Sequence, residues 1–205
     1  MIELPSPRGD GPYPLDLAIR TRRSCRAFAD TPLSLDTLSR LLWSAQGVTG
    51  EDGARASPSA GREYPMQIQL AVGNVDGLAA GTYQYQVSTH ALEQLGKDDV
   101  RIALCADAID EQPWIREAAV VVILAADFPA MKTHFHSQPP VGLRGGRYIY
   151  IETGAIAQNV MLQAMALGIG SVLVGGIDEI EIQENLGLPA HLQPTALVCL
   201  GHGVD

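Results

Sequence analysis

Two stretches of the chain have the hydrophobic patterns of buried strands. Between Pro65 and Gly73, apolar residues alternate with Gln67, Gln69 and Ala71, which predicts a strand with one face more apolar than the other. Ala118 to Ala126 is an uninterrupted aliphatic run of strand length, typical of a central strand that is buried on both faces. Weaker patterns predict further strands around Tyr83 and Tyr85, at Ser171–Val174 and at Thr195–Leu200.

Helical spacing of apolar residues is clearest in two other stretches. Leu35 to Ala45 has this spacing, with Ser34 as a candidate N-cap and Gly47 as the stop signal. Tyr148 to Leu167 is apolar on most sides, so we expect a helix that is buried almost all round, inside the domain or at a subunit interface. Shorter helices are predicted near Leu15–Ile19, Asp98–Ala108 and Asp178–Leu186.

The remaining segments lack periodicity. Residues 1–14 carry four prolines and are predicted to form an extended arm, whereas residues 15–205 form one domain. Val48–Gly61 is rich in small and charged residues and is predicted to be a loop. Asp127–Gly146, with two prolines in succession and three glycines, is predicted to be a long loop that could act as a lid.

Composition narrows the classes of protein that are possible. The 205 residues carry a net charge of -9, which argues against general binding to nucleic acid or anionic membranes. No segment resembles a secretory signal, and the longest apolar run is too short to cross a bilayer. Three distant cysteines suggest neither a disulfide framework nor a zinc site. We therefore expect a soluble cytoplasmic protein.

Several common catalytic motifs are absent. The chain has no Gly-x-Gly-x-x-Gly after a strand, no Walker A sequence and no Gly-x-Ser-x-Gly elbow. His134 and His136 could in principle bind a metal, but no carboxylate or cysteine lies nearby at ligand spacing. We expect surface histidines and no metal site.

Three separated segments carry candidate chemistry. Arg22–Arg26 offers guanidinium groups and a hydroxyl at a helix end, which suit a phosphate and the electron-rich edge of a ring. Ser57–Gly61 is a loop of small residues directly before a strand, and Val174–Asp178 contains a bare glycine pair against which a flat ring could lie. Each segment also has a plainer interpretation, as solvated arginines, an ordinary loop and a turn.

The order and spacing of these segments resemble the nitroreductase superfamily over nearly the whole chain, nearest to its short azoline-dehydrogenase-like branch. The residues that carry the resemblance are Arg22-Arg23-Ser24-x-Arg26, Phe28, Pro32-Leu33-Ser34, Leu41 to Gly47, Pro58-Ser59-Ala60-Gly61, Tyr64-Pro65, Gly81-x-Tyr83-x-Tyr85, Ala157-Gln158-Asn159, Leu167-Gly168, Gly175-Gly176, Leu186-Gly187-Leu188 and Leu200-Gly201.

The resemblance implies an α+β fold in which helices flank a mainly antiparallel central sheet. It also implies a homodimer whose long central helices pack together, with FMN bound at the subunit interface. The residues it assigns to FMN are Arg22, Arg23, Ser24, Arg26, Pro58, Ser59, Ala60, Gly61, Leu173, Val174, Gly175 and Gly176.

Each assigned group has an implied role. Arg22 and Ser24 would hold the phosphate, and Arg23 would line the site. Arg26 would face the N1 and O2 edge of the flavin, where a fixed cation stabilises the charge of the reduced ring. The loop Pro58–Ala60 would come from the partner chain, and a backbone N–H of the glycine pair would point at N5. No catalytic side chain is then needed, because flavin N5 carries the chemistry.

The resemblance fails in two places. The chain stops at Asp205, where many relatives continue with a segment that adds a basic residue to the phosphate site. The azoline-dehydrogenase branch has a Lys-Tyr pair where this chain reads Pro139 to Arg144. Arg144, Arg147 and Tyr148 remain candidate substrate-pocket residues, although they could equally form a charged helix start.

The leading hypothesis is an FMN-dependent oxidoreductase with a ping-pong mechanism. NADH or NADPH would reduce the flavin, and a small acceptor such as a nitroaromatic or quinone would reoxidise it. The alternatives are a flavin store or sensor without nicotinamide turnover, an azoline-type dehydrogenase of modified peptides, and a dimeric interaction module without a cofactor.

Overall fold

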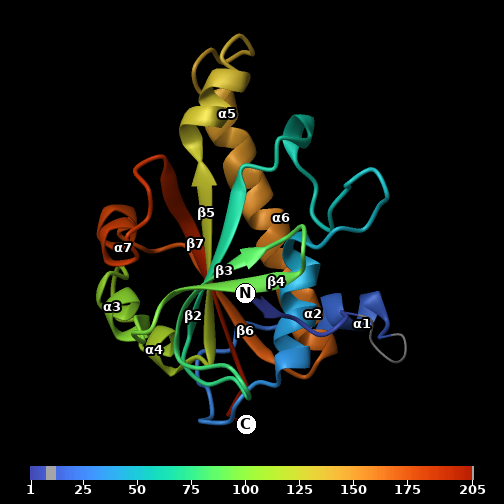
Figure 1. The fold of residues 1–205 in the computed structure, drawn as a ribbon, viewed down its shortest axis with the longest axis vertical. Helices are drawn as coiled ribbons and strands as arrows, with labels where there is room; N and C mark the ends of the chain where they lie inside the picture. Colours follow the sequence, from blue (N-terminus) through green and yellow to red (C-terminus); the bar gives the residue numbers. More distant parts are fainter. Residues whose placement is uncertain (8–12, 205) are drawn as a thin grey trace.

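An antiparallel sheet of seven strands forms the middle of the protein (Figure 1). The computed structural model describes residues 1–7 and 13–204. The spatial order is β1-β4-β3-β2-β5-β7-β6, and every neighbouring pair is antiparallel. The strands are β1 (Ile2–Glu3), β2 (Met66–Val72), β3 (Gly81–Gln86), β4 (Ala91–Gly96), β5 (Val120–Asp127), β6 (Gly170–Val174) and β7 (Leu192–Gly201).

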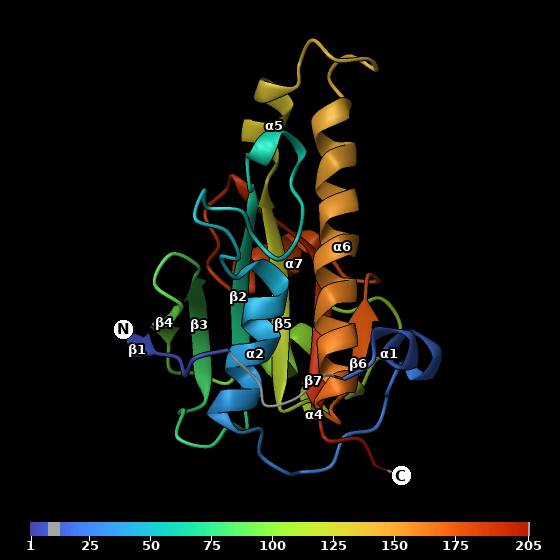
Figure 2. The same ribbon diagram turned by 90° about the vertical axis from the view of Figure 1, so that its right-hand side faces the viewer.

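Helices cover both faces of the sheet, so the predicted α+β class is confirmed. The helices are α1 (Leu15–Thr21), α2 (Leu35–Gln46), the 3-10 turn η1 (Ala60–Arg62), α3 (Arg101–Ala106), α4 (Trp114–Glu117), α5 (Phe128–His134), α6 (Arg144–Ala166) and α7 (Glu179–Asn185). Helices α1, α2 and α6 lie on one face, and α3, α4 and α7 lie on the other (Figures 1 and 2). Within the described residues, no helix has the length and apolarity needed to span a membrane.

Strand β5 is the centre of the fold, as its uninterrupted aliphatic sequence predicted. It pairs with β2 on one side and with β7 on the other. Val120, Val122 and Leu124 pack into the core beneath α2 and α6, whereas Val121 and Ile123 pack into the core beneath α3, α4 and α7. A strand with two buried faces needs apolar residues at every position, which explains the absence of alternation.

Helix α2 begins and ends where the sequence predicts. The Ser34 side chain accepts a hydrogen bond from the backbone N–H of Thr37 at 3.1 Å, so one of the unpaired donors of the first turn is satisfied. Gly47 follows the last turn, and a Cβ at this position would collide with the Trp43 side chain. Leu38, Leu41, Leu42 and Ala45 of its apolar stripe are buried in the core, and Leu35 at the start is partly buried.

The predicted loop over Asp127–Gly146 is wrong at both ends. Asp127 caps a further helix, α5, by accepting a hydrogen bond from the N–H of Ala130 at 2.8 Å. Helix α6 begins at Arg144, before the predicted start at Tyr148. Gly145 lies in its first turn, where a Cβ would strike the backbone of Met131. This glycine therefore permits close packing of α5 on α6 and does not mark a loop.

The start of the chain is extended and packs on the sheet of its own domain. Ile2 and Glu3 pair with Leu92 and Ala91 of β4, and Leu4 is buried. Residues 8–12 of the predicted arm lie outside the described residues. The sequence patterns also gave no indication of β4 or of the single-turn helix α4.

Candidate functional site

The arginine segment lies along the outer edge of the sheet. It follows α1, and Ser24 forms a parallel bridge with Ser171 of the edge strand β6. The N–H of Cys25 donates to the carbonyl of Ser171 at 2.9 Å. The fold thus brings the arginines of the N-terminal third next to the strand that leads into Gly175 and Gly176.

Within residues 1–7 and 13–204, the guanidinium groups of this segment have no acidic partner. No carboxylate of the described residues lies within 4.0 Å of Arg22, Arg23 or Arg26. Arg23 donates to the carbonyls of Arg20 and Arg22 at 3.1 and 2.7 Å, so it also caps the negative end of α1. Arg22 and Arg23 line a cavity of about 280 Å³ beside Ser171. Unpaired cations around a hollow, in a protein of net charge -9, favour an anionic ligand.

Beyond Ser171, the edge of β6 remains open. Because the Ser171 backbone faces outward to Cys25, strand alternation turns the backbones of Leu173 and Gly175 outward too. The Leu173 side chain is 41% exposed, and a Cβ at Gly175 would meet nothing within 4 Å. The side chain of Val174 is buried in the core, so only its backbone can face a ligand. A flat group could therefore approach this backbone closely.

The Gly176 peptide is held by a segment that sequence reasoning missed. The carbonyl of Gly176 accepts hydrogen bonds from the N–H of Ile109 and from the Gln112 side chain, each at 2.9 Å. Trp114 follows in the same segment, and the Arg26 guanidinium lies 5.5 Å from the centre of its ring. Residues 109–114 therefore contact both the glycine pair and Arg26. A polar residue in a loop carries no sequence signal for such a distant contact.

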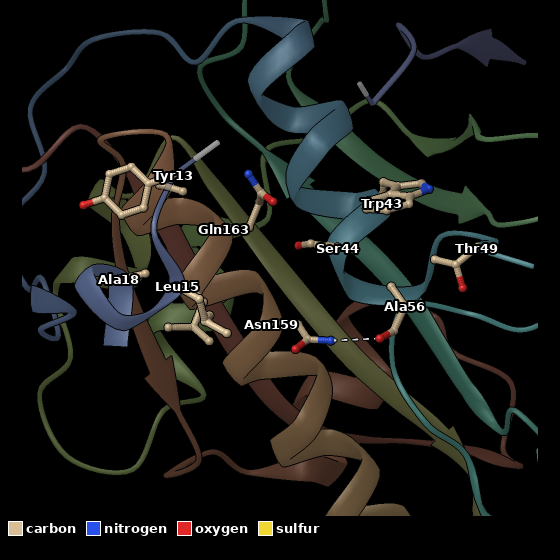
Figure 3. Close-up of a pocket in the computed structure, with 11 residues that line it drawn as sticks. Tyr13, Leu15, Ala18, Trp43, Ser44, Thr49, Ala56, Asn159 and Gln163 are labelled. Carbon is tan, nitrogen blue, oxygen red and sulfur yellow. Dashed lines mark hydrogen bonds between the residues drawn. The ribbon is translucent and has the colours of Figure 1, made fainter. Parts of the chain in front are cut away.

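The small-residue loop before β2 is fastened to α6. The Asn159 side chain donates to the carbonyl of Ala56 at 3.2 Å, as Figure 3 shows, and to the Ser57 hydroxyl at 3.0 Å. The N–H of Ala60 donates to a carboxylate oxygen of Glu152 at 2.8 Å. Glu152 and Asn159 are seven residues apart and so share one face of the helix. Together they hold the loop that contains Pro58 and Ser59 along α6.

Glu152 has unusual surroundings for a carboxylate. It is 3% exposed, and its Oε2 atom has no hydrogen-bond partner among the described residues. Burial raises the pKa of this carboxyl, and the hydrogen bond from Ala60 opposes the rise. Sequence reasoning missed Glu152, although a signal existed, since it is the single acidic residue within α6.

One chain does not bring all the predicted residues together. The arginines lie near Met165 at the end of α6, whereas the loop from Pro58 to Gly61 is fastened at Glu152. At 1.5 Å per residue, these points of α6 are about 20 Å apart. The arginine segment and the glycine pair are neighbours in one chain, and the loop is remote from both.

The candidate pocket residues at the start of α6 are still farther from the arginines. The Arg144 guanidinium donates to the carbonyl of Pro139, with Nε at 2.7 Å, and the Tyr148 hydroxyl donates to Gln138 at 3.0 Å. Both side chains hold the preceding turn, as expected of a charged helix start, whereas Arg147 is exposed. At the rise of an α-helix, Arg144 and Met165 are about 30 Å apart.

The histidine pair has an ordinary environment. His134 lies 3.4 Å from a carboxylate oxygen of Glu63, and its ring contacts Phe135. The His136 ring lies 3.1 Å from the carbonyl of Thr133. Over residues 1–7 and 13–204, no group of three or more His, Cys, Asp or Glu side chains is arranged to hold a metal ion.

One face of α6 is left uncovered in the single chain. Tyr150 and Ile151 are 58% and 66% exposed, and Gly154 continues the same face one turn later. Farther along the helix, a groove of about 400 Å³ opens between α1, α2 and α6 (Figure 3). It is lined by Tyr13, Leu15, Ala18, Trp43, Ser44, Thr49, Ala56, Asn159, Leu162, Gln163 and Ala166. Apolar surface of this kind is typical of a protein interface.

Residues at the edge of β6 fit the FMN that the sequence resemblance implies. FMN combines an anionic phosphate with a flat ring that accepts and donates hydrogen bonds. The unpaired arginines suit the phosphate. Open space at Gly175 and the outward backbone of β6 suit the ring.

Comparisons with known proteins point to one family. The model of the nitroreductase family matches residues 19–202. A proposed nitroreductase of Methanocaldococcus jannaschii is 36% identical over 184 residues, covering 90% of this chain and 88% of that protein. The crystal structure of a proposed nitroreductase from Ralstonia eutropha superposes with a TM-score of 0.84, at 27% identity, covering 100% of this chain and 90% of that one. An NADPH-flavin oxidoreductase of Vibrio harveyi is 27% identical over 44% of this chain and 39% of its own length.

Proposed function

This chain belongs to the nitroreductase family, and on that premise we propose that it is an FMN-dependent oxidoreductase that uses NADH or NADPH. The observation that carries the proposal is the meeting of the arginine segment and the glycine pair on the edge of β6. The relationship to the NADPH-flavin oxidoreductase of Vibrio harveyi supports the choice of flavin and of electron donor.

In this proposal, Arg22 and Ser24 hold the phosphate at the end of α1. Arg23 lines the same cavity while it caps that helix. Arg26 would face the N1 and O2 edge of the ring, where its charge would stabilise the negative charge of the reduced state. An N–H of the glycine pair is the donor to N5.

Bound FMN would supply hydride transfer at N5, first from the nicotinamide and then to a nitroaromatic, a quinone or a similar acceptor, which is a ping-pong scheme. The chain's own residues bind, orient and polarise the ring and supply no nucleophile. The choice of acceptor then depends on the walls of the site, for which Arg144, Arg147 and Tyr148 remain candidates.

A homodimer completes the proposed site. Pairing two α6 helices antiparallel about a two-fold axis would cover the exposed face around Ile151. It would also bring the loop Pro58–Gly61 of one subunit toward the arginines of the other. The loop lies beside Glu152 and the arginines lie near Met165 at the end of α6, and antiparallel helices place these two positions side by side. This arrangement explains how residues about 20 Å apart in one chain can serve one ligand.

Two alternatives predict different behaviour. A flavin store or sensor would bind FMN that dithionite bleaches and reduced nicotinamide does not. An azoline-type dehydrogenase would act on modified peptides, but the segment Pro139–Arg144 lacks the Lys-Tyr pair of that branch.

The decisive experiment is an absorbance spectrum of the purified protein. We expect a yellow protein with an oxidised-flavin spectrum that NADH or NADPH bleaches without oxygen and that a quinone or nitroaromatic restores. Arg26→Ala removes a charged partner of the ring and should weaken FMN binding about 10- to 100-fold. Arg40→Ala, on α2, is the charge-matched control. A colourless protein that ignores added FMN would contradict the proposal.

A further inference from the structure

The backbone proposed to contact the flavin ring contains two consecutive glycines and is therefore flexible on its own. Gly175 and Gly176 follow the end of β6, and no hydrogen-bond partner for either N–H occurs among the described residues. Glycine has more backbone freedom than any other residue, so two in succession can point their N–H groups in many directions. A donor that serves flavin N5 must instead keep one direction before the ligand arrives.

The neighbouring segment 107–112 restricts that freedom by holding the chain directly after the glycine pair. Ala108 bridges Ile177, and the N–H of Asp178 donates to the carbonyl of Asp107 at 2.8 Å. The Gln112 side chain donates to the carbonyls of Ile109 and Gly176, both at 2.9 Å. It thereby ties its own turn to the peptide between Gly176 and Ile177, which follows the glycine pair directly. The thiol of Cys105 donates to the backbone carbonyl of Gln112 at 3.4 Å and holds that turn from behind.

We propose that Gln112 is a positioning residue: by holding the peptide between Gly176 and Ile177, it narrows the directions in which the Gly175 and Gly176 N–H groups can point beside the flavin ring. The role rests on the proposed function, since the ring is the ligand these groups serve. The Gln112 amide nitrogen would lie 3.3 Å from a Cβ at Gly176, so this side chain packs directly against the bare backbone. Gln112 therefore acts through the glycines and does not contact the reacting atoms.

The test compares two glutamines that make the same kind of contact. Gln183 also donates from its side chain to two carbonyls, those of Pro189 and Leu192 at 3.3 and 2.6 Å, but on the turn before β7. Gln112→Met and Gln183→Met each remove both hydrogen bonds while keeping the length of the side chain and adding no charge. The two variants should lose similar thermal stability, so a merely structural role would not separate them.

Two readouts are needed, with the full chain in each. Without FMN, nuclear magnetic resonance spectra of the chain labelled with ¹⁵N-glycine report on the glycine N–H groups. The Gly175 and Gly176 signals should broaden or exchange faster in Gln112→Met and stay unchanged in Gln183→Met. With FMN, Gln112→Met should bind the cofactor about tenfold more weakly, as expected if the hydrogen bond from a glycine N–H to the flavin is lost. It should also shift the flavin absorption and midpoint potential, whereas Gln183→Met should not.

Each outcome decides the proposal. Unchanged glycine signals in Gln112→Met, or equal flavin affinity and potential in the two variants, would overturn it. If the unaltered protein bound no FMN, the proposed function would fall, and the glycine signals alone would then decide whether Gln112 fixes these N–H groups.

Discussion

Gly175 is the residue at which a ligand would come closest to the backbone. A Cβ there meets nothing of the chain within 4 Å, whereas one at Gly176 meets the Gln112 side chain. The backbone of Gly175 does not lie in the left-handed region that only glycine favours. Gly175→Val should thus leave unfolding stability within about 0.5 kcal/mol of the unaltered protein, as for an exposed position.

The same valine fills the space that the ring is proposed to occupy. Gly175→Val should therefore abolish FMN retention, and Gly175→Ala should reduce it by less. Flavin released from heat-denatured protein and measured by fluorescence checks the order, with thermal unfolding as the control on folding. Full FMN content in the valine variant would place the ring elsewhere.

His90 joins three parts of the chain through a partly buried hydrogen-bond network. With its proton on Nε2, His90 accepts from the Tyr85 hydroxyl at 2.8 Å and donates to the Ser39 hydroxyl at 2.7 Å. Ser39 in turn donates to the carbonyl of Pro5 at 2.5 Å. Every member is satisfied while the imidazole is neutral. Burial raises the pKa of the Tyr85 hydroxyl, so it stays protonated over the physiological range.

This network makes stability depend on pH on the acid side. Burial lowers the pKa of His90 below its ordinary value of 6.5. Below about pH 6.5 the unfolded chain takes up a proton that the folded protein resists, so stability falls until the folded pKa is reached. His90→Asn should flatten this part of the curve, because it removes the group that titrates. Asparagine is chosen because it tolerates the positive φ of 48° at this position. Urea unfolding between pH 5 and 8 measures it, and His191→Asn, at an exposed position, should keep the slope.

At the scale of elements, local pattern predicted some boundaries and missed others. β5 was predictable because a strand buried on both faces is an uninterrupted run of apolar residues. α2 was predictable because its N-cap and its apolar spacing are both local features of the sequence. β4 was missed because its last four residues, Glu93–Gly96, are not buried, so no alternation appears. Helix α5 was missed because it is short and begins with Phe128 and Pro129. Gly145 has the local signature of a loop residue, but the contact that requires a glycine there is with Met131 in another helix.

The contact between α6 and the loop before β2 depends on two polar side chains. Glu152→Leu leaves the N–H of Ala60 without its acceptor, and Asn159→Leu leaves the carbonyl of Ala56 without its donor. Losing a buried hydrogen-bond partner costs about 1 to 3 kcal/mol. Each variant should speed proteolytic cleavage within residues 48–61. Glu152→Gln, which keeps a carbonyl oxygen for Ala60, is the matched control and should cleave at the rate of the unaltered protein.

At the scale of the whole molecule, the sheet explains which part of the site sequence could predict. The arginine segment and the glycine pair were identified by family resemblance, and their adjacency follows from the bridge between Ser24 and Ser171. Gln112 and Glu152 were not identified, because their contacts join segments 64 and 92 residues apart. No local pattern encodes such contacts. In the proposed site, the loop Pro58–Gly61 would reach the arginines from a second chain.

That requirement leads to a prediction about assembly. Ile151 is 66% exposed on the uncovered face of α6, and Ile102 is 71% exposed on α3, on the opposite face of the sheet. Ile151→Glu would place a charge between paired α6 helices, where burying it without a partner costs several kcal/mol. We expect this variant to be monomeric by sedimentation and, because each site then lacks the partner's loop, to retain little FMN. Ile102→Glu makes the same change away from α6 and should remain a dimer with full flavin. If Ile151→Glu were monomeric yet kept its FMN, one chain would suffice for the site, and the loop Pro58–Gly61 would have no part in binding.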